Sequence, residues 1–519
     1  MKLVFRYLNR YRGAVALSVF LKLLGTLSEL MLPYILEHII DNVVPSGVML
    51  RVLTWGIFMF AAAIVSRQLS VGANRHAIGS AHRISYEIRQ ALFEKTVNLS
   101  GAQFDAFGLP SLISRMTSDS YNVQSAVQQF QTMCVRAPIL LLGGVLVAML
   151  MDLRLSLILI VTLPFLIAIV LAVSAKGIPM YTAVQQKLDT VVRIMRENIT
   201  GIRVVKALGK EDYETRRFGT SNRDMSRQDI AAATVMAAPG PFMQLCLNIG
   251  LTLVVFLGAR RVDAGQIKPG VILAFLTYFN MISMGVMGLS RIFMTMSKAS
   301  ASADRIDAVL QTDTDETLLP ESAAPVPEDG AFIRFDHAAF SYGGQDGAGA
   351  GFAGGAEREK ALSDISFSLQ KGESLGVIGP TGCGKTTIVN LLMRFYKPQS
   401  GSVHVDGRDV RCYGRNELRR RFGAAFQNDM IFRDTLRENV SFGRALDYKT
   451  DAAMRRAIFE HHPDTTVILI AQRVSSVMGM DKILVLDNGK CVGLGTHGEL
   501  LRSCPSYRET YQIQMGEMG

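Results

Sequence analysis

The clearest chemistry in the chain lies in a glycine-rich segment at residues 379–387, which reads Gly-Pro-Thr-Gly-Cys-Gly-Lys-Thr-Thr. Because an apolar run precedes it and a second apolar run follows it, the pattern predicts a strand, a loop and a helix in that order. Glycines allow backbone N–H groups to turn inward around an anion, the lysine can reach terminal phosphates, and the next hydroxyl can ligate Mg²⁺. An ordinary glycine turn does not account for the complete pattern. The segment therefore predicts a nucleoside triphosphate site made by Gly379, Pro380, Thr381, Gly382, Cys383, Gly384, Lys385, Thr386 and Thr387.

The first 310 residues have the composition of a membrane-embedded helical bundle. Residues 155–175 and 231–259 contain no Asp, Glu, Lys or Arg, and each stretch is long enough to cross a hydrocarbon core that needs about 20 residues. The hydropathy pattern predicts an all-α transmembrane domain over residues 1–310 with six helices, at about 14–40, 52–70, 128–151, 155–175, 236–259 and 268–290. Lys22, Glu29 and Glu37 interrupt the first span, where they either face a central cavity or lie near the interface or pair with neighbouring helices.

Basic residues in the connections orient this bundle, because short loops rich in Lys and Arg remain cytoplasmic. Lys2 and Arg6 precede the first span, and a dense basic set occupies residues 176–227 between the fourth and fifth. Both chain ends are therefore expected on the cytoplasmic side. The exception is the connection between the fifth and sixth spans, which places Arg260, Arg261 and Lys268 on the opposite side.

The overall composition agrees with this division and does not require nucleic acid as a partner. The formal net charge of +10 is accounted for by cytoplasmic loops that face anionic lipids and by a nucleotide site. The six cysteines form no C-x-x-C pair, so we predict neither a disulfide framework nor a metal cluster.

A second domain follows the bundle. Residues 311–331 are rich in Pro, Asp, Glu and Thr without apolar periodicity and read as a linker. Residues 332–519 show strands alternating with helices, which predicts an α/β P-loop NTPase domain. Residues 343–360 form a Gly/Ala-rich insertion with too little apolar mass to pack.

The order of six spans, linker, aromatic residue and phosphate loop resembles that of an ATP-binding cassette (ABC) exporter half-transporter of the multidrug or lipid exporter kind. Residues 201–207 (Gly-Ile-Arg-Val-Val-Lys-Ala) and 109–119 resemble the two cytoplasmic loops that carry short coupling helices in that family. The resemblance implies a multi-pass protein of a bacterial plasma membrane with a cytoplasmic nucleotide domain. It also implies ATP and Mg²⁺ as ligands, a second half-transporter subunit as partner in a homo- or heterodimer, contact with membrane lipids, and a hydrophobic or amphipathic transport substrate.

Two further site residues follow from the resemblance. Tyr342 occupies the position of the aromatic ring that stacks on adenine, although a tyrosine at a strand end is otherwise a packed edge residue. Gln427, in Ala-Phe-Gln-Asn, matches the glutamine that meets Mg²⁺ and the attacking water, so Thr386 and Gln427 are the expected Mg²⁺ ligands.

The family pattern then breaks, because the nucleotide domain is internally truncated near residues 457–464. The Leu-Ser-Gly-Gly-Gln signature, part of the helical subdomain and a core strand ending in Asp-Glu are missing from the sequence, and Gln472 stands where the family has its switch histidine. Asp487 belongs to a later strand, so we identify no catalytic residue. Binding of ATP and its cleavage need different groups, which leaves two hypotheses open. Either the chain is a working exporter subunit, or it is a catalytically inactive nucleotide-binding subunit that needs an intact partner. A soluble P-loop kinase or GTPase with a membrane anchor explains neither the six spans nor the loop motifs.

Overall fold

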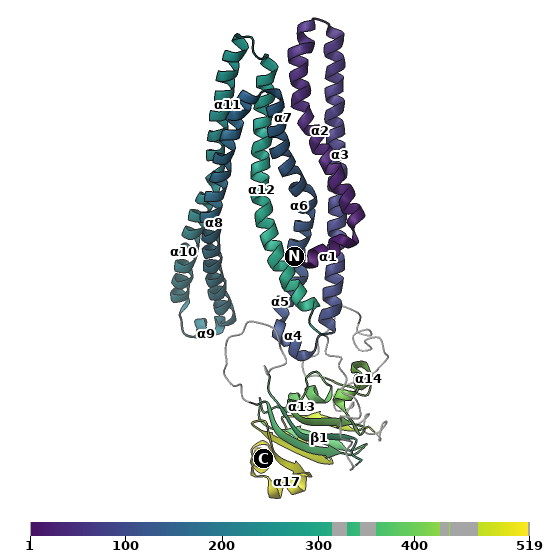
Figure 1. The fold of residues 1–519 in the computed structure, drawn as a ribbon. Helices are drawn as coiled ribbons and strands as arrows, with labels where there is room; N and C mark the ends of the chain where they lie inside the picture. The colour runs from purple at the N-terminus through teal and green to yellow at the C-terminus, as the bar shows by residue number, and fades with distance from the viewer. Residues whose placement is uncertain (1, 314–329, 343–359, 426–434, 436–464, 517–519) are drawn as a thin grey trace. The chain divides into compact units, whose positions relative to one another are not determined.

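The computed structural model describes residues 2–313, 330–342, 360–425, 435 and 465–516 of the chain (Figure 1). Gln427, the region 457–464, nearly all of the insertion 343–360 and most of the linker 311–331 lie outside the described residues. The chain divides into two compact units. The first consists of Met1–Leu92 and Ser114–Leu310, and the second of Phe93–Ile113 and Gln311–Gly519.

The first 310 residues are all-helical. Their helices are α1 (Lys2–Arg10), α2 (Arg12–His38), α3 (Met49–Val97), α4 (Gly101–Phe107), α5 (Leu109–Ser114), α6 (Ser120–Pro138), α7 (Gly144–Met151), α8 (Leu153–Thr200), α9 (Ile202–Ala207), α10 (Glu211–Ala237), α11 (Pro239–Asp263) and α12 (Pro269–Leu310). The helix α4 and most of α5 belong to the second compact unit, and the other helices form the first, except for the end of α3. Single π-helical turns at Ile39–Val43, Arg115–Asp119 and Ile139–Gly143 continue α2, α5 and α6.

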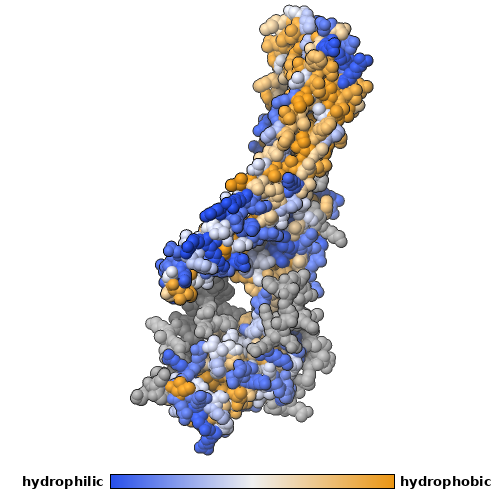
Figure 2. Space-filling view, turned by 90° about the vertical axis from the view of Figure 1, so that its left-hand side faces the viewer, coloured by the Kyte–Doolittle hydropathy of each residue, from blue (hydrophilic) through white to orange (hydrophobic). Residues whose placement is uncertain are grey.

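Six of these helical segments are long and apolar enough to cross a membrane, which confirms the predicted number of spans. They are Arg12–Ser46, Met49–Val97, Leu109–Met151, Leu153–Thr200, Glu211–Asp263 and Pro269–Leu289. Figure 2 shows an apolar surface over the part of the bundle that holds the spans and hydrophilic residues over its helical extensions. The helices continue well beyond their apolar stretches because charged residues with good helix propensity follow them.

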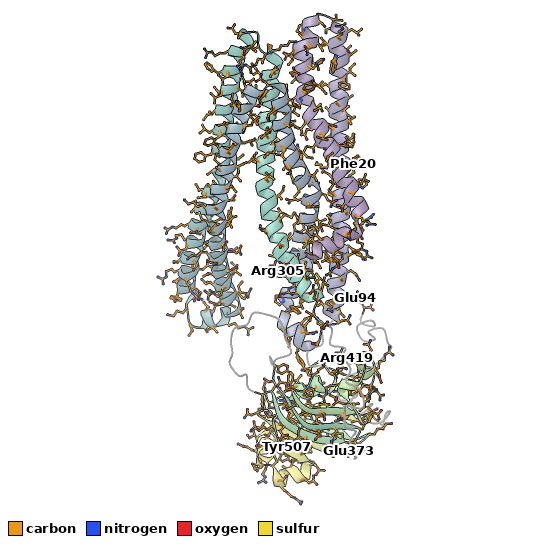
Figure 3. All side chains as sticks on the ribbon, viewed as in Figure 1. Phe20, Glu94, Arg305, Glu373, Arg419 and Tyr507 are labelled. Carbon is orange, nitrogen blue, oxygen red and sulfur yellow. The ribbon has the colours of Figure 1, made fainter. Side chains whose placement is uncertain are left out.

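Two polar contacts inside the bundle join different helices. The Arg136 guanidinium donates to the Glu29 carboxylate at 2.8 Å, and the buried Lys22 ammonium donates to the Asn74 side chain at 3.3 Å. Of the alternatives that the sequence left open for Lys22 and Glu29, pairing with a neighbouring helix is the one observed. Beyond the apolar part of α12, Arg305 (labelled in Figure 3) donates to the buried carboxylate of Asp119.

The second unit contains two four-stranded sheets. Its strands are β1 (Ile333–Phe340), β2 (Leu362–Leu369), β3 (Ser374–Ile378), β4 (Ser400–Val405), β5 (Arg408–Asp409), β6 (Val467–Ile470), β7 (Lys482–Asp487) and β8 (Lys490–Gly495). Its remaining helices include α13 (Lys385–Leu392), α14 (Arg415–Arg419), α17 (His497–Ser503) and α18 (Pro505–Gly516). One sheet has the order β2-β1-β4-β5 and is antiparallel, whereas the other has the order β6-β3-β7-β8, with β6, β3 and β7 parallel. The apolar core lies between them and α13, where Phe335 and Phe367 stack at 4.6 Å.

The strand β6 occupies one edge of the parallel sheet. It pairs with β3 in register Ser374↔Val467 to Val377↔Ile470, and no strand within the described residues pairs with its other side. All four β6 residues are partly exposed, whereas all five residues of β3 are buried. An apolar strand of the sequence Val-Ile-Leu-Ile is thus less covered than its composition would suggest.

Candidate nucleotide-binding site

The glycine-rich loop lies between β3 and α13, as its sequence predicts. The fully buried β3 ends at Ile378, the loop covers 379–384, and α13 begins at Lys385. Because β6 and β7 run parallel to β3 on its two sides, the loops that follow all three strands meet at one edge of the sheet. This is the position at which open α/β sheets bind ligands.

Two glycines of the loop are required by close backbone approaches. A Cβ at Gly379 would lie 2.1 Å from the Leu486 carbonyl oxygen of β7, and a Cβ at Gly384 would lie 2.4 Å from the Ala361 carbonyl oxygen. Gly384 also has a φ of +99°, which side-chain-bearing residues rarely adopt. The backbone of the loop is therefore held in a shape that only glycine permits.

The Lys385 side chain folds back across this loop. Its ammonium group donates hydrogen bonds to the carbonyl oxygens of Gly379 at 2.8 Å and Pro380 at 2.7 Å. The Cys383 thiol is buried beneath it, and burial raises the pKa of that thiol. A lysine held over the centre of a glycine loop is placed to contact phosphate oxygens.

Two consecutive threonines follow Lys385 in the first turn of α13, and their side chains have different surroundings. Thr386 is exposed at the mouth of the loop, where its hydroxyl can reach a cation, whereas Thr387 is buried. The Thr387 hydroxyl lies 3.2 Å from the Tyr342 hydroxyl, which also accepts a hydrogen bond from the Asn390 side chain at 3.1 Å. Tyr342 is therefore tethered to the helix that follows the phosphate loop. No sequence motif around Asn390 indicates that its side chain would contact Tyr342.

The Tyr342 ring also contacts a second tyrosine. Its edge-to-face partner Tyr396 lies at a centroid distance of 5.2 Å, and the Tyr396 hydroxyl donates to Asp105 at 2.5 Å. Asp105 belongs to α4, the short helix that forms part of the same compact unit and whose Gly101 N–H donates to the Phe395 carbonyl at 3.1 Å. A continuous set of contacts thus leads from Tyr342 to α4. This helix lies just before the segment 109–119 that the sequence singled out as a cytoplasmic loop.

Gln472 follows β6 at the same sheet edge as the phosphate loop. The preceding residue, Ala471, donates its N–H to the Val377 carbonyl at 3.1 Å, which ties the start of this loop to β3. The Gln472 side chain is exposed, but its carbonyl accepts a hydrogen bond from the Gln514 amide of α18 at 2.9 Å. The same amide group accepts from the Val474 N–H at 2.7 Å. Gln514 therefore clamps the backbone on both sides of Arg473, and nothing in its sequence context indicates this role.

Asp487 lies at the end of β7, in a hairpin with β8. It is in register with Lys490 across a two-residue turn in which Asn488 and Gly489 have φ values of +44° and +76°. Positive φ at both turn positions is typical of a tight hairpin. Asp487 therefore lies in the later strand to which the sequence assigned it.

Carboxylates stabilise the opposite ends of the central strands. The Asp481 carboxylate accepts from the Ser374 hydroxyl at 2.7 Å and from the Ser374 N–H at 2.8 Å, and these bonds lower the pKa of Asp481. The Gln370 N–H, together with Lys482 at 3.0 Å, lowers the pKa of the neighbouring Glu373 (Figure 3). These groups lie at the amino ends of β3 and β7, so they hold the sheet and do not line the phosphate loop.

The fold and the loop together define the class of this protein: a multi-pass membrane protein with a C-terminal P-loop nucleotide-binding domain. Residues 15–286 match the family model described as the ABC transporter transmembrane region, and residues 362–486 match the model described as ABC transporter. The chain belongs to the ABC transporter family, and it is an exporter-type subunit in which a transmembrane region precedes an ATP-binding domain.

The similarity to curated relatives extends over nearly the whole of both chains. An ABC transporter ATP-binding protein of Mycobacterium tuberculosis (strain CDC 1551 / Oshkosh) is 28% identical over 579 aligned positions, which cover 98% of this chain and 97% of the relative. The ABC transporter ATP-binding protein YfiB of Bacillus subtilis (strain 168) is 26% identical over 586 positions, which cover 100% and 99% of the two chains.

Proposed function

We propose that this chain binds ATP between Gly379 and Thr387 and couples that binding to export of a hydrophobic or amphipathic substrate from a bacterial plasma membrane. A second half-transporter subunit completes the dimer. The observation that carries the proposal is the position of Lys385, whose ammonium group crosses a loop with glycine-specific geometry at the carboxyl edge of a parallel sheet.

The residues at this edge fit a phosphate chain and its cation. Lys385 exchanges its two carbonyl partners for phosphate oxygens, and the exposed Thr386 hydroxyl ligates Mg²⁺ together with Gln427, which lies outside the described residues. Tyr342 supplies a flat face for adenine while its hydroxyl remains tethered to Thr387 and Asn390. Bound ATP with Mg²⁺ contributes the charge that the loop recognises and the phosphoanhydride bond that a competent dimer cleaves.

A second candidate function is a nucleotide-binding subunit that does not hydrolyse ATP by itself. Gln472 can donate a hydrogen bond near the phosphates but cannot carry the charge or transfer the proton that a histidine can. The edge position of β6 within the described residues supports the inferred loss of a neighbouring core strand. The aligned lengths of 579 and 586 positions exceed the 519 residues of this chain, which also supports an internal truncation.

ATP binding and turnover by the purified full-length protein in detergent test both candidates, with Lys385→Ala as the matched variant. We expect Lys385→Ala to weaken ATP binding by at least about 100-fold, because a charge-assisted phosphate contact and its orientation are lost together. Turnover by the chain alone would contradict the inactive-subunit candidate. Turnover only with an intact cassette subunit would support it, and ATP binding unchanged in Lys385→Ala would overturn the site assignment itself.

A further inference from the structure

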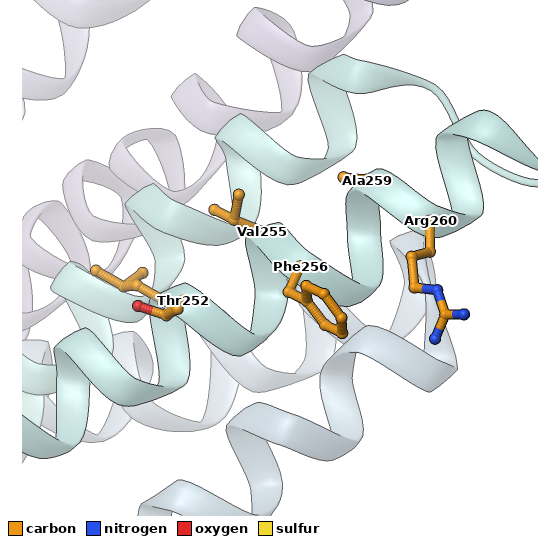
Figure 4. A pocket seen from close by; sticks show the side chains of 6 residues that line it. Thr252, Val255, Phe256, Ala259 and Arg260 are labelled. Atoms are coloured by element: carbon orange, nitrogen blue, oxygen red, sulfur yellow. The ribbon is translucent and has the colours of Figure 1, made fainter.

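The outward end of α11 carries an open groove that the nucleotide chemistry does not use. The groove has a volume of about 640 Å³ and is lined by Leu251, Thr252, Val255, Phe256, Ala259 and Arg260 (Figure 4). Its walls are apolar except for the Thr252 hydroxyl, which donates to the Asn248 carbonyl of its own helix, and the Arg260 guanidinium. Phe256 is 58% exposed and Val255 is 45% exposed, so the groove opens on the surface of a membrane-spanning helix.

Arg260 is one of the three basic residues that depart from the expected charge distribution, and the other two have partners. Arg261 contacts both oxygens of the Asp152 carboxylate, at 2.5 and 2.6 Å. Lys268 donates to the Asp41 carbonyl at 3.1 Å and to the Asn42 side chain at 2.6 Å.

Arg260 lacks an acidic partner within the described residues. Its guanidinium lies 5.8 Å from the centroid of the Phe256 ring. Asp263, the nearest carboxylate along α11, is exposed and forms no ion pair with it in the part of the chain that the structure describes. A cation that contacts only an aromatic ring at a membrane boundary can bind an anion from the surroundings.

The position of this cation matches the depth of a lipid headgroup. Arg260 lies less than one turn from the end of α11 at Asp263, whereas Leu251 lies about 13 Å further into the span at 1.5 Å per residue. Arginine binds phosphate oxygens through a planar pair of donors. A phosphate on Arg260 and an acyl chain along Val255, Phe256 and Leu251 would therefore occupy both parts of the groove at once.

We propose that this groove holds one anionic phospholipid of the outer leaflet, with its phosphate on Arg260 and one acyl chain along α11. Three observations support this occupant: the apolar lining at membrane depth, the lack of an acidic partner for Arg260 among the described residues, and the engagement of Arg261 and Lys268 with other groups of the protein. The proposal depends on the membrane orientation of the subunit and not on ATP, so its failure would leave the nucleotide site untouched.

Native mass spectrometry of the full-length protein, released from detergent after addition of phosphatidylglycerol or phosphatidylcholine, tests this site. We expect Arg260→Ala to reduce the apparent affinity for phosphatidylglycerol about fivefold, the effect of one basic residue near an anionic surface. Arg260→Lys should restore most of that affinity. Arg51→Ala is the matched control, because Arg51 is an exposed arginine near the outward end of α3 and does not line the groove. Ala259→Trp should reduce retention of both lipids by filling the groove.

Four results would overturn the proposal. Phosphatidylglycerol retention could be the same in Arg260→Ala and the parent protein, or fall equally in Arg51→Ala. Inorganic phosphate could displace the lipid completely, which would indicate an ion site without acyl-chain recognition. Finally, Ala259→Trp could convert dimers into monomers in the same spectra, which would identify the groove as an interface with a second copy. Equal melting temperatures of Arg260→Ala and Arg51→Ala in detergent exclude a general loss of folding.

Discussion

The clamp that Gln514 forms on the Gln472 loop leads to a quantitative prediction. Replacing Gln514 with leucine removes the hydrogen bonds to the Gln472 carbonyl and from the Val474 N–H, which measure 2.9 and 2.7 Å, while keeping a good helix former in α18. Each bond contributes about 1 kcal/mol, so the local opening free energy of the loop should fall by about 2 kcal/mol. Because 1.4 kcal/mol is tenfold, the Val474 amide should exchange about 30 times faster.

Hydrogen–deuterium exchange of the peptide containing Val474 measures this change directly. Gln512→Leu is the matched control, because Gln512 lies on the same helix and is exposed. Gln514→Glu separates the two bonds: the Val474 N–H keeps an acceptor, so its protection should persist, while the Gln472 carbonyl loses its donor. Unchanged Val474 exchange in Gln514→Leu, or equal acceleration in Gln512→Leu, would refute the clamp.

Three further perturbations test the geometry of the two units. Gly384→Ala places a Cβ 2.4 Å from the Ala361 carbonyl oxygen at a φ of +99°, so we expect loss of ATP binding by fluorescence titration together with a lower melting temperature. Hydrogen bonds from Ser374 lower the pKa of Asp481, so its stabilising contribution is present above about pH 4 and is lost as pH falls through the folded-state pKa. Asp481→Asn should therefore lower the melting temperature at pH 7 and make it less dependent on pH below about pH 4. Asp152→Ala removes two interactions: the N-cap of α8, in which the Asp152 carboxylate accepts the Leu155 N–H at 2.8 Å, and the ion pair with Arg261. Loss of an N-cap alone costs about 1 kcal/mol, so the free energy of unfolding of the membrane unit should fall by more than this amount.

The parts of this protein that could be predicted from sequence are those specified by neighbouring residues. The phosphate loop depends on nine consecutive positions, because positive φ and close backbone approach at Gly379 and Gly384 exclude other residue types. The number of spans follows from hydropathy, which a helix of about 20 residues displays without reference to its neighbours. Hydropathy reports only the part of a helix that is in lipid, so it does not show that α3 continues to Val97.

The contacts that orient the site residues join distant parts of the chain and have no local pattern. The Tyr342 hydroxyl meets Asn390, and the Gln514 amide meets Gln472, across 48 and 42 positions of sequence. Glutamine and asparagine at such positions are compatible with many exposed surroundings, so composition does not distinguish a clamp from a solvated side chain. Pairing of Glu29 with Arg136 across 107 positions likewise required the packing of α2 against α6.

The glycine-rich loop and the Gln472 loop are attached to the sheet to different extents, which bears on the proposed separation of ATP binding from hydrolysis. The phosphate loop follows β3, which is buried and hydrogen-bonded to strands on both sides. The Gln472 loop follows β6, which is partly exposed and paired within the described residues only with β3. Gln514 provides a second attachment for that loop, from the C-terminal helix and not from the sheet. The Gln472 loop is held by the Ala471 N–H bond to β3, by the buried Val474 and by the Gln514 clamp, whereas the glycine-rich loop follows a strand that is paired on both sides. Under the proposed function, loosening the clamp should affect recognition of the terminal phosphate more than binding of the nucleotide as a whole.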